Sequence, residues 1–136
     1  MPLRIDAAHA PVLVVELHDR LTAVDIETFL QTGEGYIARG EPYAFVFVPR
    51  GMAVPSFAEL KTLIAWMRAH KRDLDRWYRA QALVTESAVM RGALRAILSL
   101  SPIDAPQLVT ADLDEAIAWA VQQLRASIRA SGTPPS

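Results

Sequence analysis

The side chains best suited to chemistry are few, and their spacing matches no catalytic or metal-binding motif. The three histidines, His9, His18 and His70, show neither H-x-x-H nor H-E-x-x-H spacing, and cysteine is absent. No G-x-S-x-G, Walker or G-x-G-x-x-G motif occurs. Because acid–base catalysis needs polar groups that converge, we expect a non-enzymatic protein without a metal or another cofactor.

Two arginines are spaced so that they could hold an anion. Arg91 and Arg95 lie one helical turn apart in a predicted helix, and Arg50 lies in an earlier loop. Guanidinium groups clamp a phosphate or a carboxylate because each offers paired N–H donors. A solvated helix face is the alternative, since charged side chains on helices usually face water. An anion clamp at Arg91 and Arg95 is therefore an open hypothesis.

These residues are organised around the stretch 45–67, FVFVPRGMAVPSFAELKTLIAWM, which combines an apolar run, a turn and an amphipathic helix. Pro49 is expected to end the strand because it lacks a backbone donor. Ser56 and Glu59 form an S-x-x-E capping box at the start of the helix. The loop between strand and helix follows the carboxyl end of a strand, where α/β sheets usually place their sites.

Helical periodicity predicts which face of this second helix is buried. At about 100° per residue one apolar stripe forms, and it contains Phe57, Leu60, Ile64 and Met67. Trp66 lies off that stripe, on the side of Glu59 and His70. An exposed tryptophan often marks an interface. Alternatively, the helix covers the sheet more widely and Trp66 is tucked along its flank; Trp119 poses the same question.

Length and composition predict one globular domain, 1–130, followed by a disordered tail, 131–136. Half of the 136 residues are hydrophobic, at 51%, so a substantial core can form. A net charge of −1 gives no electrostatic case for a nucleic-acid partner. No apolar run approaches the roughly 18 residues that span a bilayer, and no signal-peptide pattern is present. We therefore expect a cytoplasmic protein that does not insert into a membrane.

The remaining pattern alternates strands and helices. Strands are predicted at 3–6, 12–17, 43–48, 79–85 and 107–110, and helices at 22–39, 56–71, 88–100 and 112–128. The stretch 71–76 is predicted to be charged and solvated. This order predicts an α/β domain with a single mixed, largely parallel sheet of about four to five strands and about four helices.

The pattern resembles a STAS domain, the fold of bacterial anti-sigma-factor antagonists and of the cytoplasmic part of sulfate transporters. It is most similar to a stand-alone branch of that superfamily related to the CRAL-TRIO lipid-binding fold. The resemblance covers about residues 3–125 and is carried by VVELHDRLTAVDIETFL at 14–30, FVFVPRGMAVPSFAELKTLIAW at 45–66 and RGALRAILSLSPIDAPQLVTADLDEAIAWAV at 91–121.

The resemblance implies a regulatory module that binds a partner protein or a second copy of itself. In the antagonists, a serine at the start of the helix after the third strand is phosphorylated by a partner kinase, and Ser56 occupies the matching position. The usual Asp-Ser-Ser/Thr-Gly signature is replaced by Val-Pro-Ser-Phe at 54–57, and capping alone already explains Ser56. The expected partner-binding residues are Arg50, Met52, Ser56, Glu59 and Trp66.

The likeness to CRAL-TRIO proteins implies a second function of a different class. On that basis the protein is a carrier or sensor of a small apolar, lipid-like molecule held between a helix and the sheet.

Overall fold

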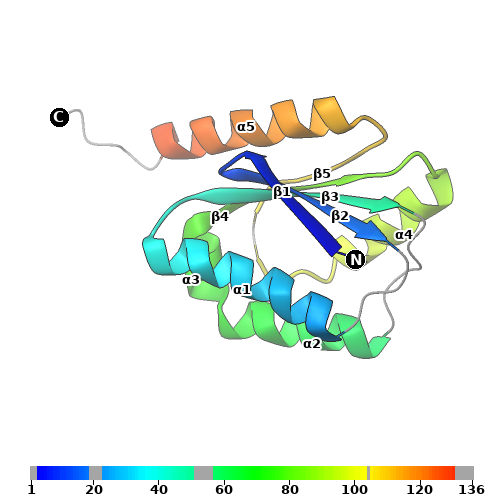
Figure 1. Ribbon diagram of the computed structural model, residues 1–136, viewed down its shortest axis with the longest axis horizontal. Coiled ribbons are helices and arrows are strands. Elements are labelled where there is room, and N and C mark those ends of the chain that lie inside the picture. The colour runs from blue at the N-terminus through cyan, green and yellow to red at the C-terminus, as the bar shows by residue number, and fades with distance from the viewer. Residues whose placement is uncertain (1–2, 19–22, 51–56, 104, 131–136) are drawn as a thin grey trace.

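The computed structural model describes residues 3–18, 23–50, 57–103 and 105–130, and in these ranges it contains one sheet of five strands and five helices (Figure 1). In chain order the elements are β1 (Leu3–His9), β2 (Val12–His18), α1 (Ala23–Arg39), β3 (Tyr43–Arg50), α2 (Phe57–Ala69), α3 (Lys71–Trp77), β4 (Tyr78–Val84), α4 (Ala88–Leu98), β5 (Gln107–Thr110) and α5 (Leu113–Ala130). The predicted α/β class with a mixed, largely parallel sheet is confirmed.

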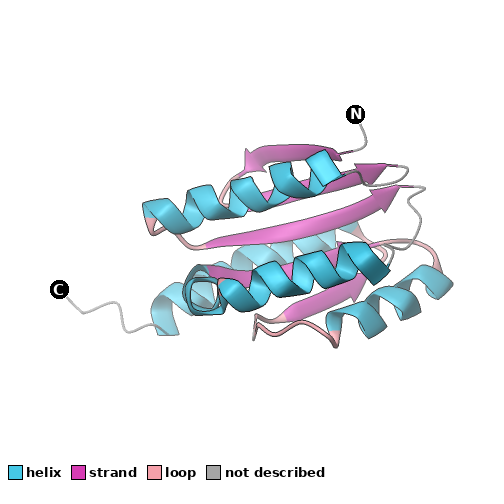
Figure 2. Cartoon of the chain, turned by 90° about the horizontal axis from the view of Figure 1, so that it is seen from below, coloured by secondary structure: helices cyan, strands magenta, loops and turns pink. Residues whose placement is uncertain are grey.

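The strands pair in the order in which they follow one another along the chain. β1 and β2 form an antiparallel hairpin, and β2, β3, β4 and β5 are parallel neighbours. Each parallel step moves across the sheet in the same direction, and such crossovers are right-handed. The connecting helices α1, α2 and α4 therefore share one face, which Figure 2 shows in front of the strands. α5 covers the opposite face (Figure 1).

The face under α5 is built from small and β-branched side chains. Its buried residues are Val12, Val14, Ala44, Val46, Val48, Ala80, Ala82, Val84, Ala116, Ala120 and Leu124. Ala116 and Ala120 of α5 are fully buried. Because alanine adds so little bulk, the α5 backbone can approach the strands closely, and its Cα atoms come within 8 Å of those of all four parallel strands.

The opposite face carries the aromatic side chains. Tyr43, Phe45 and Phe47 alternate along β3 and so point to the same side of the sheet. Their rings contact one another and the rings of Phe29, Tyr36 and Tyr78 at centroid distances of 4.8 to 5.6 Å. An aromatic layer thus separates the sheet from α1 and α2.

Helices α4 and α5 each begin with a capping side chain. The Ser87 hydroxyl accepts from Met90 N at 3.1 Å at the start of α4. Asp112 Oδ1 accepts from Asp114 N at 2.9 Å and from Glu115 N at 3.2 Å at the start of α5. Both satisfy backbone donors that a helix start leaves unpaired. Ser56, the predicted cap of α2, lies outside the described residues.

Three predictions about local structure are wrong. The stretch 71–76, predicted to be solvated, forms helix α3, whose Leu74 is buried at 2% exposure. A helix of seven residues with one buried apolar side chain is too short for its periodicity to be recognised in the sequence. Pro49 does not end its strand, because it pairs with Leu17 of β2 in register. The β3–β4 pairing ends at Phe47, so at Pro49 the strand has β2 on one side, and proline still offers its carbonyl as an acceptor. β1 continues to His9 rather than ending at residue 6.

Candidate functional site

A cavity of about 180 Å³ lies between the aromatic face of the sheet and the helices that cover it. Nearly all of its lining is apolar. It follows β3 from Tyr43 to Pro49 and is closed by side chains of α1, α2, α3 and α4. The lining residues are Leu17, Asp25, Ile26, Phe29, Leu30, Gly33, Tyr43, Phe45, Phe47, Pro49, Leu60, Leu63, Trp66, Met67, Leu74, Tyr78, Gln81, Leu83, Leu94, Ile97 and Leu98.

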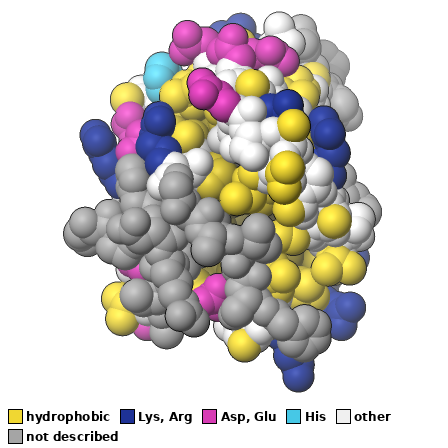
Figure 3. All heavy atoms as spheres, turned by 90° about the vertical axis from the view of Figure 1, so that its right-hand side faces the viewer, with side chains coloured by type: hydrophobic (Ala, Val, Ile, Leu, Met, Phe, Trp, Pro, Cys, Tyr) yellow, Lys and Arg dark blue, Asp and Glu magenta, His cyan; other side chains and the backbone are white. Residues whose placement is uncertain are grey.

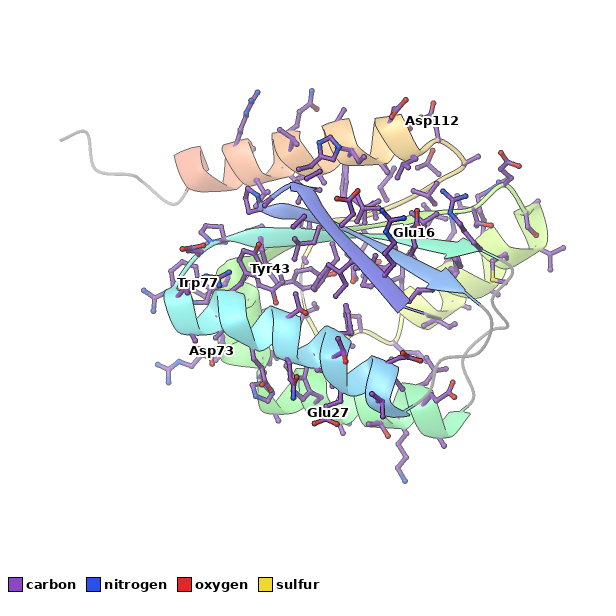
Figure 4. All side chains as sticks on the ribbon, viewed as in Figure 1. Glu16, Glu27, Tyr43, Asp73, Trp77 and Asp112 are labelled. Carbon is purple, nitrogen blue, oxygen red and sulfur yellow. The ribbon has the colours of Figure 1, made fainter. Side chains whose placement is uncertain are left out.

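The sequence explains why space remains on this face. Large rings on β3 and β4 hold α1 and α2 away from the strands, so these helices reach the sheet mainly through side chains. Figure 4 shows Tyr43 in the layer between the sheet and α1. The α1 residues Ile26, Phe29, Leu30 and Gly33 all line the cavity, so they form the inner face of that helix.

Gly33 allows α1 to approach Tyr43 closely. A Cβ at this position would lie 3.2 Å from the hydroxyl oxygen of Tyr43. Any larger residue would therefore displace the Tyr43 ring or the helix. The tyrosine hydroxyl occupies the space that the missing side chain leaves.

A small polar group interrupts the apolar lining. Tyr43 and Tyr78 are partners in the β3–β4 ladder, and their rings stack with centroids 5.2 Å apart. The Tyr78 hydroxyl donates to Gln81 Oε1 at 2.9 Å. Burial raises the pKa of Tyr43 above its ordinary value, and burial together with the neighbouring Tyr43 raises the pKa of Tyr78. Both phenols are therefore protonated at neutral pH and act as hydrogen-bond donors.

Trp66 belongs to the cavity wall. Its indole Nε1 donates to Glu34 Oε1 at 3.1 Å, and its ring stacks on His70 at a centroid distance of 4.3 Å. Of the two alternatives for Trp66, the structure has the tucked one, and Trp119 is likewise packed against the core under α5. Leu63 and Trp66 line the cavity while Ile64 does not, so the buried face of α2 is wider than the predicted stripe and rotated from it.

Of the other expected partner-binding residues, Arg50 borders a different region. Arg50 ends β3, and its Nε lies 3.6 Å from Glu16 Oε1. It borders a polar hollow of about 670 Å³ at the carboxyl ends of β3 and β4, beside the starts of α4 and α5. Glu59 is half-buried in the first turn of α2. Met52 and Ser56 lie outside the described residues.

Figure 3 faces this end of the molecule. Apolar side chains gather in the middle of the face, next to residues that are not described, and acidic side chains gather along the edge formed by α5.

The proposed anion clamp is only partly open to a ligand. Arg91 Nη1 donates to the backbone carbonyl of Thr85 at 3.0 Å, which ties this guanidinium to the end of β4. Arg95 is exposed on α4, one turn further along. Arg50 borders the polar hollow, whereas neither Arg91 nor Arg95 is among the residues that line it.

Sequence reasoning missed the polar residues of the cavity. Gln81 in the run Ala80–Val84 was the available signal, because a polar side chain inside an apolar strand needs a buried partner. Tyr43 was assigned to the strand core without a further role. Among the described residues no group of three or more His, Asp or Glu side chains is placed to hold a metal ion. Within the same residues no helix has both the length and the apolar character required to cross a bilayer.

Comparison with solved structures shows that the chain has a SpoIIAA-like fold, which is the STAS-type fold predicted from the sequence. A similar structure is an uncharacterised protein of the DUF3478 family from Shewanella loihica, described as having a SpoIIAA-like fold. The two align with a TM-score of 0.61 and 15% sequence identity, over 87% of this chain and 91% of that one. No family model and no curated protein matches this chain.

Proposed function

We propose that this protein is a STAS-type regulatory module that binds a small apolar molecule between the sheet and helices α1, α2 and α4, as a carrier or sensor. The apolar cavity is the observation that supports this proposal. Trp66 adds to the support, because it contributes to the cavity wall instead of standing free on the surface.

The size of the cavity limits the ligand. An apolar cavity of about 150 Å³ in another protein stays dry and binds benzene. The cavity here, at about 180 Å³, has room for a single ring with a small substituent. Its lining is of the kind that binds such molecules, since apolar walls with few polar groups are typical of small-molecule sites.

The protein performs this role without chemical turnover, in our proposal. Among the described residues of the lining, Asp25 is the single carboxylate, and it lies in the first turn of α1. Tyr43 begins β3, and its hydroxyl lies beside Gly33, near the middle of α1. The Asp25 carboxylate and the Tyr43 hydroxyl therefore meet different parts of α1. General acid–base catalysis needs such groups within hydrogen-bond reach of one reacting atom.

Thermal unfolding in the presence of toluene tests the proposal. A ligand that binds the folded state stabilises it in proportion to its occupancy, so the melting temperature should rise by about 3 °C at roughly three times the Kd. Leu63→Phe enlarges a lining side chain and should weaken binding at least about tenfold, because it fills the space that the ring needs.

Leu100→Phe is the matched control, since Leu100 is 56% exposed and lies outside the cavity. It should respond to toluene as the unmodified protein does. An absent shift, or an equal shift in Leu63→Phe, would contradict ligand binding in this cavity. Native mass spectrometry of the purified protein adds a search for a bound natural molecule.

The second candidate is a partner-protein module that uses the carboxyl end of the sheet. The polar hollow supports it, because Arg50, one of the expected partner contacts, lines the hollow together with Thr85 and Ser87. Phosphorylation of Ser56 would regulate such a contact. A Ser56→Asp variant should then recover a different set of proteins in a pull-down at an unchanged melting temperature. A discrete dimer or co-purifying protein without a bound small molecule favours this candidate over the first.

A further inference from the structure

Two hydrogen-bond donors in the cavity have no acceptor within the described part of the chain. Tyr43 is 1% exposed and Gln81 is 6% exposed, and both line the cavity. Gln81 Oε1 is used by Tyr78, while the Tyr43 hydroxyl and Gln81 Nε2 make no hydrogen bond with any described residue. Leaving a buried donor unpaired is unfavourable by about 1–3 kcal/mol, so such groups usually have a partner.

Both donors still contact open space. Among the described residues, Arg79 Nε is the side-chain polar atom that is both sealed from solvent and without a partner. The Tyr43 hydroxyl and Gln81 Nε2 are therefore not sealed, and the space they meet is the cavity that they line.

The two donors lie close to each other on adjacent strands. Tyr43 and Tyr78 pair across β3 and β4 with stacked rings, so both phenols extend from the sheet in the same direction. Gln81 contacts the second of these hydroxyls at 2.9 Å. Both free donors thus belong to residues that adjoin Tyr78, so we expect a ligand group that enters beside Tyr78 to be within reach of both.

The charge of the lining excludes an anionic ligand group. No Lys, Arg or His is among the described residues that line the cavity, so a carboxylate or phosphate would be desolvated without a counter-charge. Asp25, the one charged side chain among the described lining residues, is acidic and would repel an anion. It lies about 12 Å from Gly33 along the α1 axis, so it does not supply the missing acceptor.

We infer that the apolar molecule bound in the cavity carries a neutral hydrogen-bond acceptor, such as a ketone or ester carbonyl, which accepts from the Tyr43 hydroxyl and the Gln81 side-chain amide. This inference rests on the proposed function and names the chemical class of its ligand.

Three probes of nearly equal shape test it: acetophenone, α-methylstyrene and benzoate. The first has a carbonyl, the second has a methylene group in its place, and the third is an anion. Dissociation constants are measured by calorimetry or ligand-observed NMR. Tyr43→Phe should weaken acetophenone about five- to tenfold, the usual effect of one hydrogen bond. It should change α-methylstyrene by less than about twofold, because no hydrogen bond is lost there.

Tyr36→Phe is the matched control. Tyr36 stacks on Tyr43 at 5.2 Å but does not line the cavity, so the same substitution should change neither constant. Gln81→Met is compared with its parent in a Tyr78→Phe background, so that no hydroxyl loses its acceptor, and it too should weaken acetophenone selectively. Benzoate should bind at least about a hundredfold more weakly than acetophenone.

The outcomes separate this inference from the proposed function. If both neutral probes bind the unmodified protein and Tyr43→Phe affects them equally, the acceptor is not recognised, although the cavity binds ligands. The inference is also overturned if benzoate binds as tightly as acetophenone. If neither neutral probe binds, the proposed function itself is wrong.

Discussion

On one face of the sheet, Ala116 and Ala120 of α5 pack against alanine and valine side chains of the strands. On the other face, α1 and α2 meet Tyr43, Phe45 and Phe47 of the same strand β3. The first contact brings the helix backbone close to the strands along its length, and the second leaves a cavity of about 180 Å³. A single strand therefore contributes to a tightly packed core on one side and to the cavity on the other.

The difference follows from side-chain size. Small residues on both surfaces interdigitate without gaps, and interiors of that kind reach the density of organic crystals. Large rigid rings seldom fill a surface without gaps. Ring–ring contacts hold the rings at set distances from one another, and the helices that pack on the rings are held away from the sheet. Large aromatic residues thus bury much apolar area and still leave space. The α5 face should tolerate changes of volume poorly, and the cavity face should tolerate them well.

Leu124→Ala on α5 should give the largest effect. Leu124 is 5% exposed in the tightly packed core, so its truncation should reduce the free energy of unfolding by about 2–5 kcal/mol. Leu63→Ala on α2 removes the same atoms from a half-buried side chain beside the cavity and should reduce it by about 1 kcal/mol. Urea titrations of both variants measure the difference, and equal losses would mean that the two faces are packed alike.

Ala120→Leu should be the next largest effect, in the direction of overpacking. Ala120 is fully buried against the strands, so the added atoms force α5 outward at a loss of about 1–3 kcal/mol. Leu63→Phe adds volume on the cavity face, where space exists, and should change stability by less than about 0.5 kcal/mol. If chemical denaturation finds Leu63→Phe as destabilised as Ala120→Leu, the cavity is not available to a larger side chain.

The tightly packed face could be predicted from the sequence in some detail. The β-branched runs at 12–17 and 43–48 identify β2 and β3, and Asp112 identifies the start of α5. These features depend on residues close together in the chain. Helix α3 and the orientation of α2 could not be predicted in the same way. α2 lies between the other helices of its face, so it buries more than one narrow stripe, and Trp66 turns inward as a result.

The cavity itself could not be read from the sequence. It depends on how completely side chains from four helices and the strands fill the space between them, which no local pattern records. The resemblance to CRAL-TRIO proteins raised the general idea of a ligand between helix and sheet. That the Tyr43 hydroxyl has no acceptor among the described residues is a property of the folded chain, because Gly33 and Tyr78 beside it come from other elements.

High pH should destabilise the folded protein through the two buried phenols of the cavity face. The folded protein raises the pKa of Tyr43 and Tyr78 above their ordinary value of 10.0, so the unfolded chain loses these protons first. Stability is then unaffected below about pH 10 and falls as the pH rises further, by about 1.4 kcal/mol per pH unit for each phenol. Denaturant titrations over this range measure the slope. The double variant Tyr43→Phe, Tyr78→Phe should lose that part of the slope, and an unchanged slope would assign it to other groups.

The smallest effects should come from the two stacked tyrosines taken one at a time, and they should differ in sign. Tyr78→Phe removes the donor to Gln81 and should reduce the free energy of unfolding by about 1 kcal/mol. Tyr43→Phe removes a buried hydroxyl that has no acceptor among the described residues, so the ligand-free protein should become more stable by about 0.5–1 kcal/mol.

Thermal and urea unfolding of the ligand-free protein measure both changes, and the ring stacking at 5.2 Å is kept in each variant. A loss of stability in Tyr43→Phe would show that its hydroxyl is already satisfied, and the case for a ligand acceptor at this position would then fail. A gain would mean that the folded chain retains an unfavourable group on the cavity face. A protein retains such a group at a loss of stability when the group is used in binding. A site with an unpaired donor is selective, because a ligand without an acceptor leaves that donor unpaired.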